Sequence, residues 1–117
     1  MPHMLLIIEP VGQREERGVE GGQALYQRML DFTEELRRDG VLMASSSLAT
    51  PATRLQRPAG AAAPRVLDGP FAEAREMVGG FFLLNCATRQ AALDWAGRCP
   101  AAAWATVEVR ETGPCFT

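Results

Sequence analysis

Hydrophobic residues are grouped in four segments with the length and pattern of strands. These predicted strands are residues 3–9, 41–48, 78–86 and 106–110. The first contains five consecutive apolar residues and ends before a proline, and the last alternates between polar and apolar positions, as strands do. Gly79 and Gly80 within the third strand indicate a bulge or a close approach of two backbones.

Two helices are predicted from apolar residues spaced three and four positions apart. Leu25, Met29, Phe32 and Leu36 form the apolar face of the first. It ends in a basic turn followed by Gly40, which is typical of a helix C-terminus. Thr88 is expected to cap the second helix, which ends at Pro100. Residues 11–22 are charged and glycine-rich, and we expect them to form a loop.

Residues 52–71 alternate weakly on both sides of an Ala/Pro-rich stretch, as a long β-hairpin does. The four strands and two helices follow the order βαββαβ, and this hairpin is an addition between the second and third strands. This is the ferredoxin-like split βαβ arrangement of the α+β class, with an antiparallel sheet. A chain of 117 residues has the usual length of one domain, so we expect residues 1–117 to form a single domain.

The predicted sheet has more apolar surface than its own helices can cover. Two helices cover one face of a four-stranded sheet, yet residues 4–8 and 81–84 are apolar at both parities, so both faces of these strands favour burial. We therefore expect a homodimer in which a second copy packs sheet against sheet, as a dimeric α/β barrel.

Charge and composition exclude several functions. Hydrophobic residues make up 47% and charged residues 22% of the chain, and the net charge is −2. This balance fits a soluble domain and gives no basic surplus for binding nucleic acid. All twelve basic residues are arginine, which excludes a Schiff-base lysine and a phosphate-loop lysine. The apolar run at residues 4–8 is too short for a signal peptide or a membrane span, so we expect a cytoplasmic protein.

The cysteines and the single histidine do not form a metal-binding pattern. Cys86, Cys99 and Cys115 include no C-x-x-C pair, which favours free thiols in a reducing compartment. With one histidine in the whole chain, a zinc site is not expected. We expect neither a metal nor a cofactor.

The densest group of charges lies between residues 68 and 80. If residues 72–77 form a helical turn, Glu73 and Glu76 share one face, and their repulsion could give one of them a role in acid/base chemistry. Asp68, Glu73 and Glu76 are therefore the candidate catalytic residues. The alternative is a solvated loop in which Arg75 neutralises its neighbours.

The run Asp-Gly-Pro-Phe at residues 68–71 also has a structural interpretation. Asp68 is expected to accept backbone N–H bonds near residues 70–72, as an aspartate in a turn does. A positive φ at Gly69 would favour glycine there. Phe71, the large apolar side chain of this polar stretch, is expected to anchor the turn in the core. This structural role for Asp68 is the one we favour over a catalytic role.

Four further residues are candidates for ligand binding: His3, Arg75, Glu108 and Arg110. Glu108 and Arg110 alternate with valines, so they project from one face of the last strand. They would line a dimer cleft if that face is enclosed, and they are ordinary surface otherwise. His3 lies close to the N-terminus, where we expect its ring to be in solvent.

The chain resembles the DGPF branch of the YCII-related family. The resemblance is carried by the Asp-Gly-Pro-Phe run at 68–71, by Glu73, Arg75, Glu76, Gly79 and Gly80, and by the segments 4–8, 35–41, 92–100 and 107–110. It covers almost the whole chain in the same order. The family implies a ferredoxin-like fold and a dimeric α/β barrel.

The resemblance also implies functions. Some relatives are similar to small-ring enzymes, including a dehydrochlorinase of chlorinated hydroxyquinols with a His–Asp pair. Met29 and Arg38 stand at those two positions here, and Asp39 lies beside the second, so the chain departs from that pattern. Genes of this branch often lie beside those of extracytoplasmic-function sigma factors.

Three functions follow as hypotheses. The first is a dimer that binds a small molecule in a cleft at the sheet. The second is an isomerase or lyase that acts on a small cyclic oxygenated substrate through the three carboxylates. The third is a regulatory partner of a sigma factor. We favour the first, because the His–Asp pair is not matched.

Overall fold

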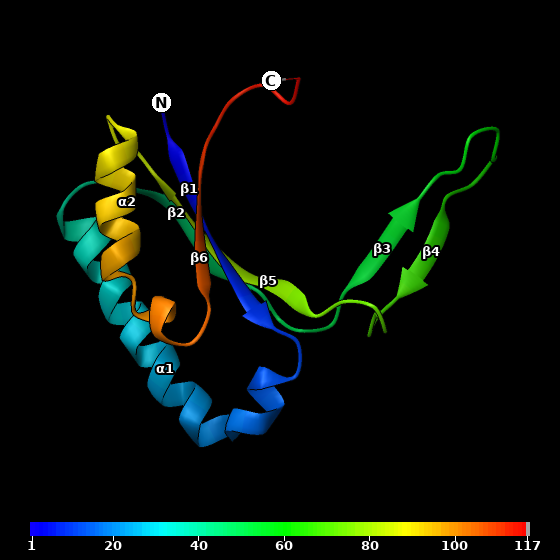
Figure 1. The fold of residues 1–117 in the computed structure, drawn as a ribbon, viewed down its shortest axis with the longest axis horizontal. Coiled ribbons are helices and arrows are strands. Elements are labelled where there is room, and N and C mark those ends of the chain that lie inside the picture. The colour runs from blue at the N-terminus through cyan, green and yellow to red at the C-terminus, as the bar shows by residue number, and fades with distance from the viewer. Residues whose placement is uncertain (117) are drawn as a thin grey trace.

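A computed structural model describes residues 1–116 of the chain. Four strands form an antiparallel sheet in the order β2-β5-β1-β6. They are β1 (His3–Pro10), β2 (Leu42–Ser47), β5 (Glu76–Leu84) and β6 (Thr106–Glu111). Helix α1 (Gln13–Arg38) joins β1 to β2, and α2 (Arg89–Arg98) joins β5 to β6 (Figure 1). The predicted α+β class with an antiparallel sheet is confirmed, and the strand order is consistent with a ferredoxin-like fold.

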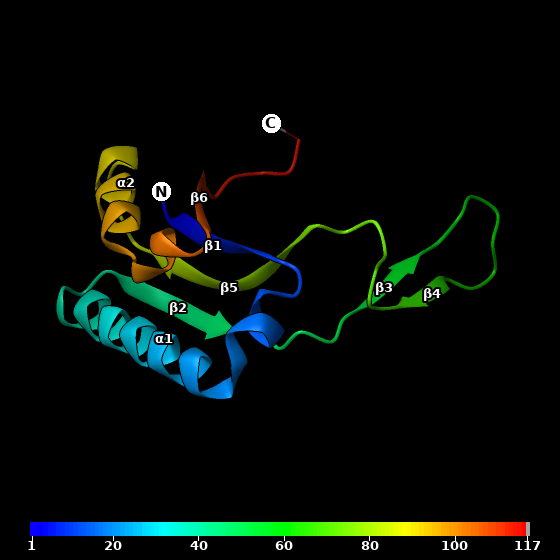
Figure 2. The same ribbon diagram turned by 60° about the horizontal axis from the view of Figure 1, so that its bottom comes forward.

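The extra hairpin extends away from this body. It consists of β3 (Thr53–Gln56) and β4 (Arg65–Asp68), which form a separate two-stranded sheet. Both views of the ribbon show it projecting from the end of β2 and β5 (Figures 1 and 2). We call residues 53–68 the arm. The predicted hairpin is therefore present, and it stands apart from the four-stranded sheet.

The hydrophobic core lies between the helices and one face of the four-stranded sheet. Phe32 of α1 packs edge-to-face on Phe82 of β5, with ring centroids 5.4 Å apart, and on Trp95 of α2 at 6.1 Å. Leu5 and Leu36 are fully buried in the same cluster. Because residues from both helices meet the same parity of β1 and β5, both helices cover the same face of the sheet.

The two glycines of β5 form the predicted bulge. Ile7 of β1 pairs with Gly80 and Ile8 pairs with Val78, so Gly79 is the extra residue. At Gly80, a Cβ would lie 2.9 Å from the carbonyl oxygen of Ser46. The prediction of a bulge and of a close backbone approach is therefore confirmed, since a larger residue would push β2 away from β5.

The start of α1 corrects the expectation of a loop over residues 11–22. The helix begins at Gln13, and its regular geometry is interrupted at Gly18, where φ is 80°. Glu15 and Glu16 lie in its first turn, where negative charge is favoured by the helix dipole. Only Gly12 and Gly18 of this segment need glycine's access to positive φ, so most of the glycine-rich stretch is helical.

The other helix ends match their predicted signals. Gly40 has a φ of 76°, and the amide of Val41 donates to the carbonyl of Leu36 at 3.2 Å, which is a Schellman-type end. At α2, Oγ1 of Thr88 accepts the amide of Ala91 at 3.1 Å. A short 3-10 helix, η1 (Pro100–Ala103), follows α2. Neither helix of the described chain combines the length and apolarity that crossing a membrane requires.

Candidate functional site

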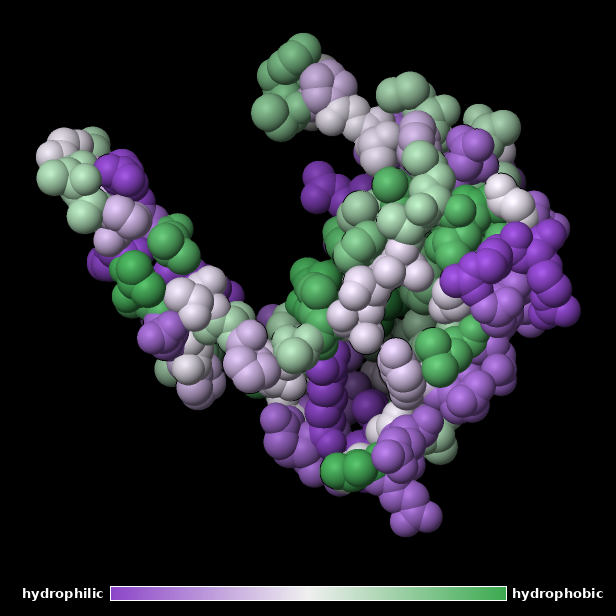
Figure 3. All heavy atoms as spheres, turned by 180° about the vertical axis from the view of Figure 1, so that it is seen from behind, coloured by the Kyte–Doolittle hydropathy of each residue, from purple (hydrophilic) through white to green (hydrophobic). Residues whose placement is uncertain are grey.

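The face of the sheet opposite the helices has an apolar centre. Met4, Leu6 and Ile8 of β1 point to this face and are only half-buried. Their cross-strand neighbours are also apolar and half-buried: Leu6 pairs with Phe81, and Met4 pairs with Leu83. Seen from behind, the body has hydrophobic patches next to hydrophilic ones (Figure 3). We call the sheet surface formed by Met4, Leu6, Ile8, Phe81 and Leu83 the open face.

Charged and polar residues border the open face at its two edges. Along β6, Glu108 lies opposite Leu6 and Arg110 lies opposite Met4, and both charged side chains are exposed. Along β2, Ser46 lies beside the apolar centre. Glu108 and Arg110 therefore share one face, as predicted. The arrangement combines an apolar floor with a guanidinium that can bind an anionic group.

His3 lies on the helix side of the sheet, which makes the expectation of a histidine in solvent wrong. Its side chain is 2% exposed, because alternation along β1 places residue 3 on the same face as Leu5 and Ile7. Neither ring nitrogen has a hydrogen-bond partner within residues 1–116. His3 is therefore separated by the sheet from Glu108 and Arg110, with which it was grouped.

The candidate catalytic carboxylates lie at the base of the arm and outside the hydrophobic core. Asp68, Glu73, Arg75 and Glu76 are all exposed. A turn closes between the amide of Ala74 and the carbonyl of Phe71 at 3.0 Å, and β5 begins at Glu76, so no helical turn spans residues 72–77. Within residues 1–116, no ion pair joins two of these four side chains.

The run at residues 68–71 adopts a different structure from the one expected. Asp68 accepts a hydrogen bond from Oγ1 of Thr53 across the hairpin, at 2.7 Å, instead of bonds from the amides that follow it. Gly69 does not have a positive φ. Phe71 is half-buried outside the core, with the guanidinium of Arg54 3.8 Å from its ring centroid. The run therefore fixes the base of the arm.

An ion pair that was not predicted from the sequence joins a buried carboxylate of β1 to a partly exposed arginine of α1. Glu9 is 6% exposed, and its Oε1 lies 2.6 Å from Nε of Arg14. The same guanidinium donates to the carbonyls of Leu48 at 2.7 Å and Gly79 at 3.3 Å. One arginine thus joins four segments. Glu9 alternates with Leu5 and Ile7, which places it on their side of the sheet. The sequence does not reveal that this side is the buried one, because the residues on both sides of β1 are apolar.

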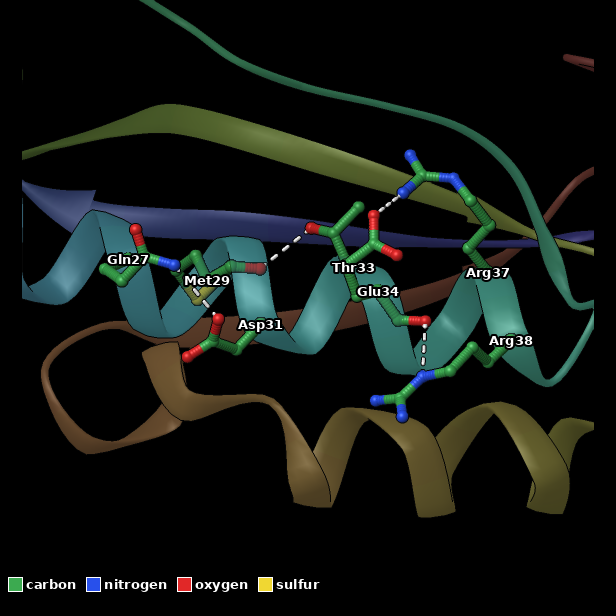
Figure 4. Close-up of polar contacts among 7 residues, drawn as sticks. All are labelled: Gln27, Met29, Asp31, Thr33, Glu34, Arg37 and Arg38. Carbon is green, nitrogen blue, oxygen red and sulfur yellow. Dashed lines mark hydrogen bonds and ion pairs between the residues drawn. The ribbon is translucent and has the colours of Figure 1, made fainter.

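The positions that the resemblance assigns to a His–Asp pair lie on α1 (Figure 4). The carbonyl of Met29 accepts from Oγ1 of Thr33 at 2.8 Å, and Nε of Arg38 donates to the carbonyl of Glu34 at 3.4 Å. Met29 also packs against the core. These contacts support the helix, and neither side chain can act as the acid or base of the enzyme pattern.

Near the end of α1, a depression of about 270 Å³ lies between the two helices. It is lined by Glu35, Arg38, Asp39, Trp95 and Arg98. Arg98 donates to Glu35 at 3.1 Å and its guanidinium lies 4.3 Å from the ring centroid of Trp95. Arg98 and Glu35 neutralise each other, and Arg38 and Asp39 add one charge of each sign, so the lining of this depression has no net charge.

The cysteines are free thiols in two environments. Cys86 and Cys99 are buried, whereas Cys115 is exposed. Burial raises the pKa of the Cys86 thiol. Burial also raises the pKa of Cys99, and a backbone hydrogen bond from Ala101 partly opposes this effect. Residues 1–116 contain no group of three or more His, Cys, Asp or Glu side chains that could hold a metal ion.

The strand order and the uncovered sheet define a small α+β protein with one solvent-facing sheet surface. The family model of the YCII-related domain matches residues 1–114, and the chain therefore belongs to the YCII-related family. An uncharacterized protein of Rhizobium meliloti (strain 1021) is 55% identical over 31 residues. This match covers 26% of the present chain and spans only 25% of that relative's length.

Proposed function

We propose that the chain forms a homodimer through the open face and binds a small molecule between the two sheets. The observation that supports this proposal is the half-buried apolar strip of β1 and β5, on the face away from both helices. A contiguous apolar surface on a soluble domain is typical of an interface or a ligand site. Two such surfaces packed together would form the dimeric α/β barrel expected from the sequence.

The border of the open face suggests the class of ligand. Arg110 offers a planar set of donors beside Met4 and Leu6, which suits a flat apolar molecule with an acidic substituent. Glu108 supplies an acceptor on the same strand. We propose binding in preference to isomerase or lyase chemistry, because Asp68, Glu73 and Glu76 are all exposed and a solvated carboxylate is poorly suited to act as a general acid at neutral pH.

Two finer assignments belong to this proposal. We place the chain in the DGPF branch, which the Asp-Gly-Pro-Phe run at 68–71 supports. We also propose a cytoplasmic location, which is supported by the free state of Cys86, Cys99 and Cys115.

The dimer is tested with Leu6→Glu. Light scattering of the wild type at micromolar concentration should give about twice the 12.7 kDa of the chain, and its melting temperature should rise with concentration. Leu6→Glu should weaken dimerisation roughly 100-fold or more, because a buried unpaired charge is strongly disfavoured. The control is Val19→Glu, since Val19 is 79% exposed on α1. A monomeric wild type at 100-fold higher concentration would contradict the proposal.

Ligand binding is tested on the same proteins with anilinonaphthalene sulfonate, an aromatic anion. The wild type should enhance its fluorescence with saturation, and Leu6→Glu should abolish that enhancement. Arg110→Ala should weaken binding roughly tenfold, the loss expected for one charge-assisted hydrogen bond. Equal binding by the wild type and Arg110→Ala would remove the proposed anion contact.

A further inference from the structure

The arm stands apart from the four-stranded sheet and from the core. All eight residues of β3 and β4 are exposed, and within residues 1–116 these strands pair only with each other. A lone two-stranded hairpin is at best marginally stable in water. The arm is nevertheless regular, with all four cross-strand pairs from Thr53–Asp68 to Gln56–Arg65 in register. A contact with a surface outside the chain would stabilise it further.

The two faces of the arm differ in chemistry. Residues directly opposite in an antiparallel pair share a face, so Leu55 lies beside Val66 on one face. These side chains are 61% and 56% exposed, and they form an apolar pair directed into solvent. On the other face, Arg65 donates to Gln56 at 2.7 Å and Arg54 stacks on the ring of Phe71. On the Leu55–Val66 face, Thr53 bonds Asp68 at the base of the arm, and the apolar pair beyond it remains directed into solvent.

Charge favours a second copy of this chain as the partner. Between Thr53 and Asp68 the chain has three arginines and one acidic residue, whereas the remainder has nine arginines and thirteen acidic residues. The arm is therefore basic and the body acidic. Opposite charges attract the arm of one copy to the body of another and discourage contact between two arms. A two-fold dimer satisfies both arms at once, because it uses each contact twice.

The position of the arm connects it to the open face. β5 follows the arm, and Val78, which pairs with Ile8 at the near end of the sheet, is 43% exposed. Apolar surface therefore extends from the open face toward the base of the arm. We propose that each arm lies across the edge of the partner's open face, with its Leu55–Val66 face packed against the partner. This inference uses the homodimer proposed above and adds a second contact surface to it.

The test combines a double variant with amide exchange on the wild type. Leu55→Ser/Val66→Ser should raise the dimer dissociation constant roughly 100-fold, because two apolar side chains lose their burial. The matched control is Leu67→Ser, on the opposite face of the same hairpin. This control should change the dimer dissociation constant less than threefold. In the unmodified protein, arm amides should exchange at least tenfold more slowly under dimeric than under monomeric concentrations.

The outcomes separate this inference from the proposed function. If the wild type dimerises, but the double variant dimerises equally well and arm exchange is independent of concentration, the arm contact is wrong and the open-face dimer stands. If the double variant is monomeric and Leu6→Glu still dimerises, the arm contact stands and the open-face dimer is wrong. A wild type that remains monomeric overturns both. Circular dichroism of each variant should match the wild type, since the arm lies outside the core.

Discussion

The carboxylate of Glu9 occupies the space that a side chain at position 79 would need. A Cβ on Gly79 would lie 2.5 Å from Oε2 of Glu9 and 3.0 Å from a terminal nitrogen of Arg14. The bulge, the glycine and the ion pair are therefore one arrangement: the missing side chain at position 79 makes room for a buried charge. Its guanidinium partner joins this point to the end of β2 through Leu48.

This dependence can be measured with a double-mutant cycle. Gly79→Ala alone should destabilise the fold by roughly 2 kcal/mol through overpacking. Glu9→Ala alone should cost roughly 2 kcal/mol, because it removes the carboxylate that Arg14, itself 31% exposed, is paired with. In the double variant, the cost of Gly79→Ala should fall by about 1 kcal/mol, since the clashing carboxylate is gone. Urea unfolding gives all three values, and strict additivity would contradict the arrangement.

The thiols provide a prediction about pH. In the folded chain, burial raises the pKa of both Cys86 and Cys99, so the unfolded chain loses these protons first. The contribution of the two protonated thiols to the free energy of unfolding is complete below the ordinary thiol pKa of about 8.5. It is lost as the pH rises through the raised pKa values of the folded chain. The urea concentration at the unfolding midpoint should therefore decrease as the pH is raised above about 8.5.

Labelling kinetics provide the control for this pH prediction. With Ellman's reagent at pH 8, the exposed Cys115 should react at once, and the two buried thiols should react only as the chain unfolds. Cys115→Ser should keep the same pH dependence of stability. Equal labelling rates for all three thiols would contradict the buried positions.

At the scale of elements, α1 contains a matched pair of glycines with opposite roles. Gly18 has a φ of 80°, whereas Gly22 lies in the regular part of the helix, and neither would bring an added Cβ within 4 Å of another atom. Gly18→Ala should destabilise the fold by about 1 kcal/mol through backbone strain. Gly22→Ala should stabilise it by about 0.5–1 kcal/mol through helix propensity. Thermal unfolding of both variants checks the signs, and equal signs would contradict the break at Gly18.

The elements themselves were largely predictable, because their signals are local. The spacing of Leu25, Phe32 and Leu36, the cap at Thr88 and the C-cap at Gly40 each act within a few residues. The start of α1 was missed for the opposite reason. Glycine-rich sequence argues for a loop, and the contact of Arg14 with Glu9, which stabilises this turn from across the fold, is not visible in a local pattern.

The candidate site was less predictable than the elements. The shared face of Glu108 and Arg110 follows from simple alternation, and it was correct. The environment of His3 could not be derived, since β1 is apolar at both parities and only the placement of the helices decides which parity is buried. Asp68 illustrates a further limit, because its partner Thr53 is fifteen residues earlier and depends on the register of the arm.

At the scale of the whole molecule, the two unpartnered surfaces have a common origin. A ferredoxin-like chain has two helices for a sheet with two faces, and the arm adds strands without adding any cover. Apolar residues on the open face and on the arm therefore remain accessible together, in a chain whose core is otherwise complete. The homodimer we propose would bury the apolar residues of the open face and of the arm together when two chains associate.

The position of β1 in the sheet affects how the chain is made. β1 is a central strand, bordered by β5 and β6, and these neighbours begin only at Glu76 and Thr106. During synthesis β1 therefore emerges well before either of its neighbours, and its two ladders form only after β5 and then β6 have been made. Pairing so distant in sequence is slow, because a long loop must close before any contact is gained. Until then the apolar side chains of β1 stay exposed in the nascent chain, as in any fold whose central strand pairs with distant segments.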